Sequence, residues 1–319
     1  MSDLRLSVVV PCYRRGEKVM RTVQSLLAQS LAPETYEIVL VDNGSDDETY
    51  EVLCALAERH PGRVRACQET RPGAGAARNL GVRRARADLI LFLDDDMRAD
   101  PRLLELHLAA HQGYRGSVLG FLETDWGPHQ SRFLEFLRQS QMQNNFPFSD
   151  GDLVSYRYFY TGNVSVRREA FERVGGFDES FRVYGVEDID LGYQLEMSGE
   201  TLRFVRQAVA HHDYHPTLAD FIAKRRCAGR SLAYFLLKYP HLKMHYNFGR
   251  HPWCRRTFWF VACRLANGAA GLVGRPRGLA RWQYHCFGLT IHWYMYVSYL
   301  GERWRHLRSR VRHMGSYLN

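Results

Sequence analysis

Three consecutive carboxylates, Asp94, Asp95 and Asp96, directly follow the apolar run 89–93. Carboxylates at the end of a buried strand repel one another and lose hydration, so a bound cation would hold them together. Oxygen ligands suit Mg²⁺ or Mn²⁺, and such an ion would bridge the two phosphates of a nucleoside diphosphate. A solvated acidic loop that caps a helix is the alternative, but capping needs only one acid. The run therefore predicts a site for Mn²⁺ or Mg²⁺.

Two further loops carry residues of the kind that bind nucleotides. Asp42 ends the apolar run 38–41 and precedes a turn, where its carboxylate would accept hydrogen bonds from a base or ribose. Segment 71–81 is a glycine-rich turn that leads into a helix. Its backbone N–H groups and Arg78 would therefore bind a phosphate group. Both patterns are also ordinary turn and helix-cap chemistry, and neither is specific by itself.

A pair of acids, Glu187 and Asp188, follows the turn residue Gly185 at the start of a predicted helix. The helix dipole is expected to keep a carboxylate ionised there. An ionised carboxylate can take the proton from an attacking hydroxyl group. We predict Asp188 as the general base and Glu187 as the residue that orients the acceptor; the alternative is that both only cap the helix.

The elements that must position these residues alternate between strand and helix, which predicts a mostly parallel sheet. Ligands bind at the carboxyl ends of such strands, where Pro11, Asp42 and Asp94 fall. Residues 125–160 are irregular and aromatic, and we interpret this stretch as the part of the chain that binds the molecule with the attacking hydroxyl group, the acceptor. The expected strands are 6–10, 38–41, near 64, 89–93, 118–122 and 202–205, and the expected helices are 17–29, 47–59, 76–86, one from 101, 185–197 and 218–237.

Six motifs resemble, in order and spacing, those of the family 2 glycosyltransferases with the GT-A fold. They are VVVPCY at 8–13, VDNGSDD at 41–47, GAGAARN at 73–79, FLDDD at 92–96, GGFD at 175–178 and EDIDL at 187–191. The resemblance covers roughly residues 5–235. It implies an α/β, Rossmann-like mixed sheet flanked by helices, a D-x-D metal site, and inversion at the anomeric carbon by a single displacement.

The resemblance also implies roles for single residues. Pro11, Tyr13 and Asp42 would hold the nucleobase and ribose, and Arg78 would approach the diphosphate. Asp94 would bind the ribose or the metal and Asp96 the metal, while Asp95 would point aside unless the register shifts by one residue. The candidate donor-binding residues are thus Pro11, Tyr13, Asp42, Arg71, Gly75, Arg78, Asp94 and Asp95.

Three histidines, His211, His212 and His215, lie downstream of the predicted base, in the region where many GT-A enzymes supply a further metal ligand. A neutral imidazole suits Mn²⁺. We predict His212 as the ligand, although a lone histidine is usually structural and the sequence does not separate the three. The basic run 224–230 would neutralise a pyrophosphate, or form a solvated helix face.

Charge is distributed unevenly over the 319 residues, whose formal net charge is +9. From Lys224 onward, 18 lysines and arginines stand against one acid, Glu302, which gives +17 there and −8 before it. Such a segment favours an anionic partner: a phospholipid surface, a pyrophosphate or a nucleic acid. No RRM or helix-turn-helix signature is present, so we exclude nucleic acid.

The expected domains are a GT-A domain over 1–235, with a nucleotide-binding half to 122 and an acceptor half from 123, and a helical, basic, aromatic extension over 236–319. Its apolar segments 257–273 and 284–300 fall short of the roughly 20 residues of a membrane span. Two alternatives remain for these segments. They form helices that lie in the membrane interface, or helices that pack on the main domain or on a second subunit. The seven cysteines form no C-x-x-C pair or disulfide framework, and the N-terminus lacks a leader pattern. We expect a cytoplasmic protein. The sequence does not decide whether it attaches to the inner face of the cell membrane, or whether it forms a homodimer.

Other functions fit less well. A dinucleotide-dependent dehydrogenase needs glycines after the first strand, where this chain has bulky residues at 11–15. A sugar nucleotidyltransferase lacks its glycine-rich activating loop here, and a non-catalytic membrane-surface or polyanion-binding protein leaves the acids at 94–96 unexplained. We therefore expect transfer of a hexose or N-acetylhexosamine from a nucleotide sugar, with UDP as the expected carrier, to a glycan, lipid-linked or small-molecule acceptor.

Overall fold

The computed structural model describes residues 4–127, 131–140, 146–245, 298–302 and 305. The chain divides into two compact units, which we describe separately. The first comprises Met1–Gly127, Asn144–Arg182 and Glu187–Tyr214, and the second comprises Pro128–Gln143, Val183–Val186 and His215–Asn319. The predicted boundaries at 122 and 235 stay predictions. Two apolar segments, 257–273 and 284–300, are the candidate interfacial helices of the extension. All of the first and residues 284–297 of the second lie outside the described residues.

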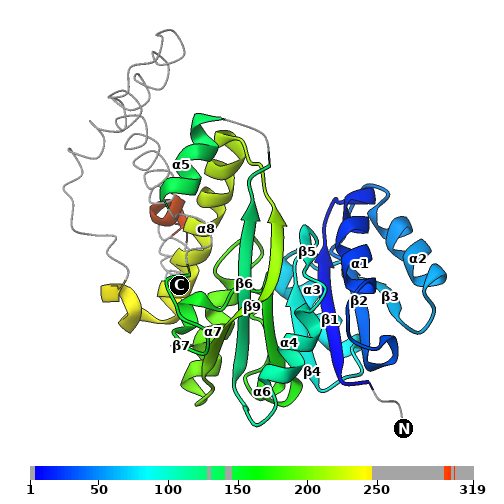
Figure 1. Cartoon of the computed structure of the whole chain (residues 1–319). Coiled ribbons are helices and arrows are strands. Elements are labelled where there is room, and N and C mark those ends of the chain that lie inside the picture. The colour runs from blue at the N-terminus through cyan, green and yellow to red at the C-terminus, as the bar shows by residue number, and fades with distance from the viewer. Residues whose placement is uncertain (1–3, 128–130, 141–145, 246–297, 303–304, 306–319) are drawn as a thin grey trace, which may run out of the picture. The chain divides into compact units, whose positions relative to one another are not determined.

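The first unit has the predicted alternation of strands and helices (Figure 1). Short 3-10 turns, such as Gly16–Lys18 before α1, join some of these elements. The strands are β1 (Leu6–Cys12), β2 (Tyr36–Asp42), β3 (Val64–Gln68), β4 (Leu89–Leu93), β5 (Met97–Ala99), β6 (Ser117–Asp125), β7 (Leu153–Val154), β8 (Asn163–Arg167) and β9 (Leu202–Asp213). The helices are α1 (Val19–Leu27), α2 (Thr49–Arg59), α3 (Ala74–Arg84), α4 (Leu103–Ala110), α6 (Arg168–Arg173) and α7 (Glu187–Met197).

The strands form one mixed sheet in the order β3-β2-β1-β4-β8-β6-β9-β5, and β7 pairs with β9. Strands β3, β2, β1 and β4 are parallel. Strand β8 is antiparallel to both β4 and β6, whereas β9 is parallel to β6 and antiparallel to β5. The predicted α/β fold with a mixed sheet is confirmed. The expectation of a mostly parallel sheet holds for β1 to β4 and for β6 with β9, whereas β5 and β8 pair with their neighbours in antiparallel fashion.

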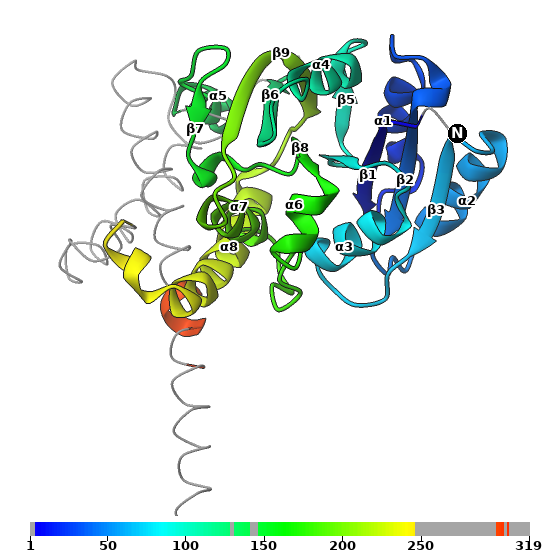
Figure 2. The same ribbon diagram turned by 90° about the horizontal axis from the view of Figure 1, so that it is seen from below.

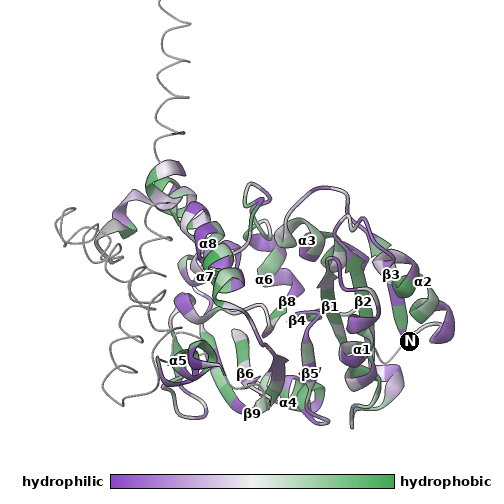
Figure 3. Cartoon of the chain, turned by 90° about the horizontal axis from the view of Figure 1, so that it is seen from above, coloured by the Kyte–Doolittle hydropathy of each residue, from purple (hydrophilic) through white to green (hydrophobic). Residues whose placement is uncertain are grey.

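Continuous apolar runs place the first strands inside the sheet, since parallel strands are buried on both faces. Every residue of β2 and β4 is buried, and β1 differs only at Pro11. The views from below and from above both show β1 and β2 between α1 on one face and α3 on the other, and Figure 3 colours both strands hydrophobic (Figures 2 and 3). The carboxyl ends of β1, β2 and β4 are thereby fixed against a packed core.

A buried polar network joins α4 to β8. The ring of His107 contacts Ser165 Oγ at 2.8 Å and Asn163 Oδ1 at 2.9 Å, and His111 Nε2 contacts the same Ser165 Oγ at 2.8 Å. The Asn163 amide also donates to the carbonyl oxygen of Ala208, at 2.8 Å, beside the irregularity in the β6–β9 pairing. Burial lowers the pKa of His107 to about 4 and that of His111 to about 3, so both rings are neutral at physiological pH.

Gly120 of β6 has no room for a side chain at this place. A Cβ there would lie 2.2 Å from Asn163 Nδ2 and 2.5 Å from the carbonyl oxygen of Ala208. We expect Gly120→Ala to lower the free energy of unfolding by about 2–4 kcal/mol, because backbone must move to admit the methyl group. Denaturant unfolding measures this, with Gly301→Ala as control, since nothing lies within 4 Å of a Cβ at Gly301. Equal stability of the two variants would contradict the close packing.

In the second unit, α5 (Arg132–Ser140) and α8 (Leu218–Lys238) contact each other through Phe133 and Phe221, whose ring centroids are 5.5 Å apart. A capping box between Thr217 and Asp220 fixes the start of α8, which confirms the helix predicted at 218–237. Helix α5 falls in the stretch that we expected to be irregular, so that expectation is wrong there. Among the described residues, no helix combines the length and apolar character needed to cross a bilayer.

Candidate active site

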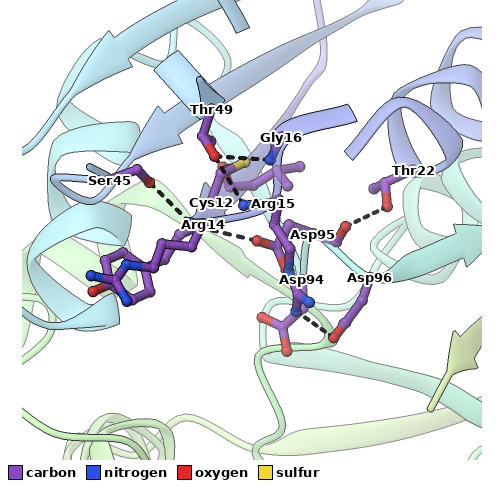
Figure 4. Close-up of polar contacts among 12 residues, drawn as sticks. Cys12, Arg14, Arg15, Gly16, Thr22, Ser45, Thr49, Asp94, Asp95 and Asp96 are labelled. Atoms are coloured by element: carbon purple, nitrogen blue, oxygen red, sulfur yellow. Dashed lines mark hydrogen bonds and ion pairs between the residues drawn. The ribbon is translucent and has the colours of Figure 1, made fainter. Parts of the chain in front are cut away.

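The acids Asp94–Asp96 form the turn between β4 and β5. Figure 4 shows Asp95 and Asp96 beside the loop that follows β1. The side chains of Asp94 and Asp96 are 34% and 21% exposed, whereas Asp95 is only 9% exposed. Burial, followed by the charges of Asp96 and Asp94, raises the pKa of Asp95 to about 7, and Arg15 opposes the rise. Two of the three acids are therefore open to a ligand.

Arg15, which our sequence analysis missed, binds two of these acids. Its Nε donates to Asp95 Oδ1 at 2.8 Å and its Nη2 donates to Asp96 Oδ2 at 2.6 Å. The backbone N–H of Tyr13 donates to Asp95 Oδ2 at 3.3 Å, and Thr22 Oγ1 donates to the carbonyl oxygen of Asp95 at 2.9 Å. Asp95 thus points inward and anchors the loop after β1. Its predicted contact with the donor stays a prediction.

Backbone conformation aims Arg15 at the acids. Arg14 has φ 50°, in the left-handed region that non-glycine residues seldom adopt. Its N–H donates to Ser45 Oγ at 2.9 Å, and the N–H groups of Arg15 and Gly16 both donate to Thr49 Oγ1 at 2.9 Å (Figure 4). Hydrogen bonds from backbone N–H groups to these two hydroxyls therefore tie the loop after β1 to the loop after β2 and to the first residue of α2.

Arg78 of α3 connects the acidic run to the predicted base region. It is 4% exposed, and it donates to Asp94 Oδ1 at 2.8 Å and to Glu187 Oε1 at 3.2 Å. Its guanidinium group also lies 5.6 Å from the centre of the Phe177 ring. Burial lowers the pKa of Arg78, but the neighbouring acids raise it further, so it stays charged. The predicted contact of Arg78 with the diphosphate stays a prediction.

Glu187 and Asp188 occupy the first turn of α7, as predicted. Glu187 is 6% exposed, and Asp188 Oδ1 accepts a hydrogen bond from the N–H of Ile189 at 2.8 Å. Burial, and then the charge of Glu187, raises the pKa of Asp188 to about 7. Desolvation thus outweighs the effect of the helix N-terminus on the pKa of Asp188. A carboxylate with such a pKa is half protonated near neutral pH.

The predicted nucleobase residues lie at the ends of β1 and β2. Tyr13 is 52% exposed, whereas Asp42 is fully buried. The Asp42 carboxylate accepts hydrogen bonds from the N–H of Ser45, at 3.2 Å, and from Gln68 Nε2, at 2.9 Å. Asp42 therefore orders the turn after β2. The ligand contacts of Pro11, Tyr13 and Asp42 stay predictions.

The glycine-rich turn is built differently from what the sequence suggested. Gly75 lies within α3, where a Cβ would come 3.1 Å from Phe177 Cβ, so this glycine permits close packing. The left-handed residue is Gly73, with φ 118°, at the N-cap of α3. Asn43 clamps the turn from both sides, because it accepts from the N–H of Gly73 and donates to the carbonyl oxygen of Arg71. The Arg71 side chain pairs with Glu69 and Glu179.

Of the three candidate histidine ligands, His212 is the one with a described contact to the acidic run. Its Nε2 is 3.5 Å from Asp96 Oδ1, and its buried Nδ1 has no hydrogen-bond partner among the described residues. His211 instead pairs with Glu123, at 3.0 Å, and His215 belongs to the second unit. A carboxylate beside an imidazole suits Mn²⁺. Among the described residues, no three His, Cys, Asp or Glu side chains form a ready metal-binding group.

The carboxyl ends of β1, β2 and β4 and the start of α7 thus meet around Arg15 and Arg78, on a mixed sheet flanked by helices that matches the GT-A fold. Residues 7–175 match the model of glycosyl transferase family 2, and the chain belongs to this family. Residues 141–216 also match the model described as the N-terminal domain of galactosyltransferase. The family that the six motifs predicted is therefore confirmed.

Curated relatives include validoxylamine A glucosyltransferase of Streptomyces hygroscopicus subsp. limoneus, 33% identical over 64% of this chain and 50% of the relative. The chain thus spans half the length of that protein. The glycosyltransferase YfnE of Bacillus subtilis is 28% identical over 75% of this chain and 72% of the relative.

Among solved structures, the mannosyltransferase PcManGT of Pyrobaculum calidifontis, in complex with GDP-Man and Mn²⁺, aligns with a TM-score of 0.63 and 19% identity over 94% of this chain and 87% of its own. S. aureus TarS 1-349, in complex with UDP, aligns with a TM-score of 0.54 and 16% identity over 96% and 92%. These two likenesses show the shared fold.

Proposed function

We propose that the enzyme transfers a hexose or N-acetylhexosamine from a nucleoside diphosphate sugar to an acceptor hydroxyl group, with inversion at the anomeric carbon. The observation that carries the proposal is the pair of contacts made by Arg78, to Asp94 at 2.8 Å and to Glu187 at 3.2 Å. They join Asp94, one of the acids proposed to hold the donor, and Glu187, the acid proposed to orient the acceptor beside the base, through one buried guanidinium group. A single displacement needs these two functions at adjacent positions.

Asp188 is the proposed general base. As the acceptor oxygen bonds to the anomeric carbon, its proton moves to the Asp188 carboxylate, and the bond from that carbon to the phosphate oxygen breaks. The nucleoside diphosphate leaves with the electron pair of that bond. A pKa of about 7 suits this task, because proton transfer is most efficient when the base titrates near the working pH.

Asp94, Asp96 and His212 are the residues that would hold a divalent ion, Mn²⁺ or Mg²⁺. When bound, such an ion supplies positive charge that stabilises the departing diphosphate. Arg78 holds Asp94 in place, and Glu187, fixed by the same arginine, orients the acceptor beside Asp188. Asp42 and Tyr13 would position the nucleobase and ribose.

UDP is the proposed carrier, in line with the UDP complex of TarS, although the GDP-Man complex of PcManGT makes GDP the natural competitor. The relative that acts on validoxylamine A points to a small-molecule acceptor. The basic residues from Lys224 onward instead support an acceptor carried by an anionic lipid at a membrane surface. Product analysis with each acceptor class separates the two.

Calorimetry of UDP, GDP, CDP and dTDP, each with and without Mn²⁺, tests donor class and metal together. We expect micromolar, Mn²⁺-dependent binding of one diphosphate. Asp96→Ala should weaken that binding about tenfold or more, because it removes one charged ligand. The matched control is Asp46→Ala, which removes an exposed acid that pairs only with Arg14 among the contacts described. Metal-independent binding, unchanged in Asp96→Ala, would overturn the assignment of the metal site.

A further inference from the structure

Arg15 forms ion pairs with two acids of the acidic run. Its guanidinium group reaches Asp95 and Asp96 at once, and its side chain is 32% exposed. Charge-assisted bonds of this kind are about twice as strong as neutral ones. The carboxylate of Asp96 is thereby shared: Oδ2 faces Arg15 at 2.6 Å, and Oδ1 faces His212 Nε2 at 3.5 Å. A divalent ion bound at Asp96 therefore either lies close to the positively charged Arg15 guanidinium group or displaces it.

The position of Arg15 also depends on the first residue of α2, Thr49, and on the loop that precedes it. Thr49 accepts from the N–H groups of Arg15 and Gly16 and itself donates to Asp47. Ser45 holds the N–H of Arg14, and Ser45 in turn donates its own N–H to Asp42. A nucleoside bound against this loop therefore contacts the segment that sets the backbone of Arg15.

We propose that Arg15 is a positioning residue that takes the place of the divalent cation beside Asp96 in the donor-free enzyme, so that the metal binds well only together with the nucleotide. This inference rests on the proposed metal-assisted function. Repulsion between the arginine and a free divalent ion weakens binding of the ion alone. A diphosphate brings negative charge that both cations share, and the repulsion is then offset.

Arg14 provides a matched control one residue away. Its guanidinium group pairs with Asp46 at 2.6 Å, where both side chains are more than half exposed, and it makes no described contact with the acidic run. Substitution of Arg14 changes the net charge of the same loop as substitution of Arg15 does. The two variants differ in contact with Asp95 and Asp96, so the comparison isolates that contact.

The experiment is Mn²⁺ titration of the full chain, followed by electron paramagnetic resonance of free Mn²⁺ and by calorimetry, with and without the diphosphate that binds best. In Arg15→Gln we expect Mn²⁺ affinity without nucleotide to rise about tenfold or more, and the gain from added nucleotide to shrink correspondingly. Arg14→Gln should leave both values as in the wild type. Arg15→Lys keeps the charge with one donor group in place of the fork, and should fall between wild type and Arg15→Gln.

The possible outcomes distinguish a failure of the proposed role of Arg15 from a failure of the proposed metal site. If the wild type binds Mn²⁺ with no diphosphate present as tightly as with one, the role of Arg15 is overturned while the metal site stands. If Arg15→Gln loses nucleotide binding with no gain in Mn²⁺ affinity, Arg15 is a diphosphate ligand and the inference is wrong. If the wild type binds no Mn²⁺ under any condition, the metal part of the proposed function falls as well. Should Arg15→Gln not fold, unchanged Mn²⁺ affinity in Arg15→Lys would overturn the inference.

Discussion

Asp188→Asn should lower kcat by about 10³-fold while leaving the affinity for the donor nucleotide as in the wild type. The amide has the shape of the carboxylate but cannot take the acceptor proton, and general base catalysis contributes about 10²–10⁴-fold. Single-turnover transfer and calorimetry of nucleotide binding measure the two quantities separately. The control is Glu169→Gln, which changes an exposed acid on α6. Normal turnover in Asp188→Asn would remove Asp188 from the reaction.

The pH dependence of the wild type gives a second measure of the same residue. Only the ionised form of Asp188 can act as base, and its pKa is raised to about 7. We therefore expect kcat/KM to fall as pH falls below about 7, and to level off above it. Donor affinity measured over the same range identifies any contribution from Asp95, whose pKa is also raised to about 7.

Mild acid should destabilise the fold through His107 and His111. Their pKa values in the fold, about 4 and about 3, lie below the ordinary value of 6.5, so the unfolded chain binds more protons in this window. Stability is therefore lost as pH falls from about 6.5 towards 4. The change for His107 alone corresponds to on the order of 3 kcal/mol. Urea unfolding at a series of pH values from neutral to 4.5 measures the loss.

The double variant His107→Gln with His111→Gln serves as the comparison. We expect it to be less stable than the wild type at neutral pH, since it disturbs the bonds to Ser165 and Asn163, but to depend less steeply on pH. Asp95 and Asp188 act with the opposite sign, because a raised carboxylate pKa adds stability as pH falls through 7. Their contribution is the same in both proteins and cancels. Parallel stability curves would show that the histidines do not control acid unfolding.

Much of the fold follows from patterns of apolar residues. The runs at 6–10, 38–41 and 89–93 predicted β1, β2 and β4, because parallel strands buried on both faces are uninterrupted and apolar. Strands β5 and β8 escaped detection, since three to five residues with mixed polarity carry no period. Their partners are set by pairing with β9, β4 and β6, which are distant in sequence.

Side-chain roles in the site were less predictable than its location. Asp94–Asp96 and Glu187–Asp188 lie at the strand and helix ends where the sequence placed them. Arg14 and Arg15 are chemically identical in the sequence, and only the left-handed backbone of Arg14 directs one to solvent and the other to the acids. In the same way, the raised pKa of Asp188 depends on burial, which no local pattern of residues reveals.

The pairing of β5 has a consequence for the newly made chain. This strand carries the acidic run into the sheet, and its described strand pairing is with β9, more than 100 residues later. During synthesis, the edge of β6 that β9 will cover is also unpaired until residues 202–213 have left the ribosome. The strand that follows the acids is thus made early but paired late, and a chain released before residue 202 would expose two strand edges that invite association with other chains.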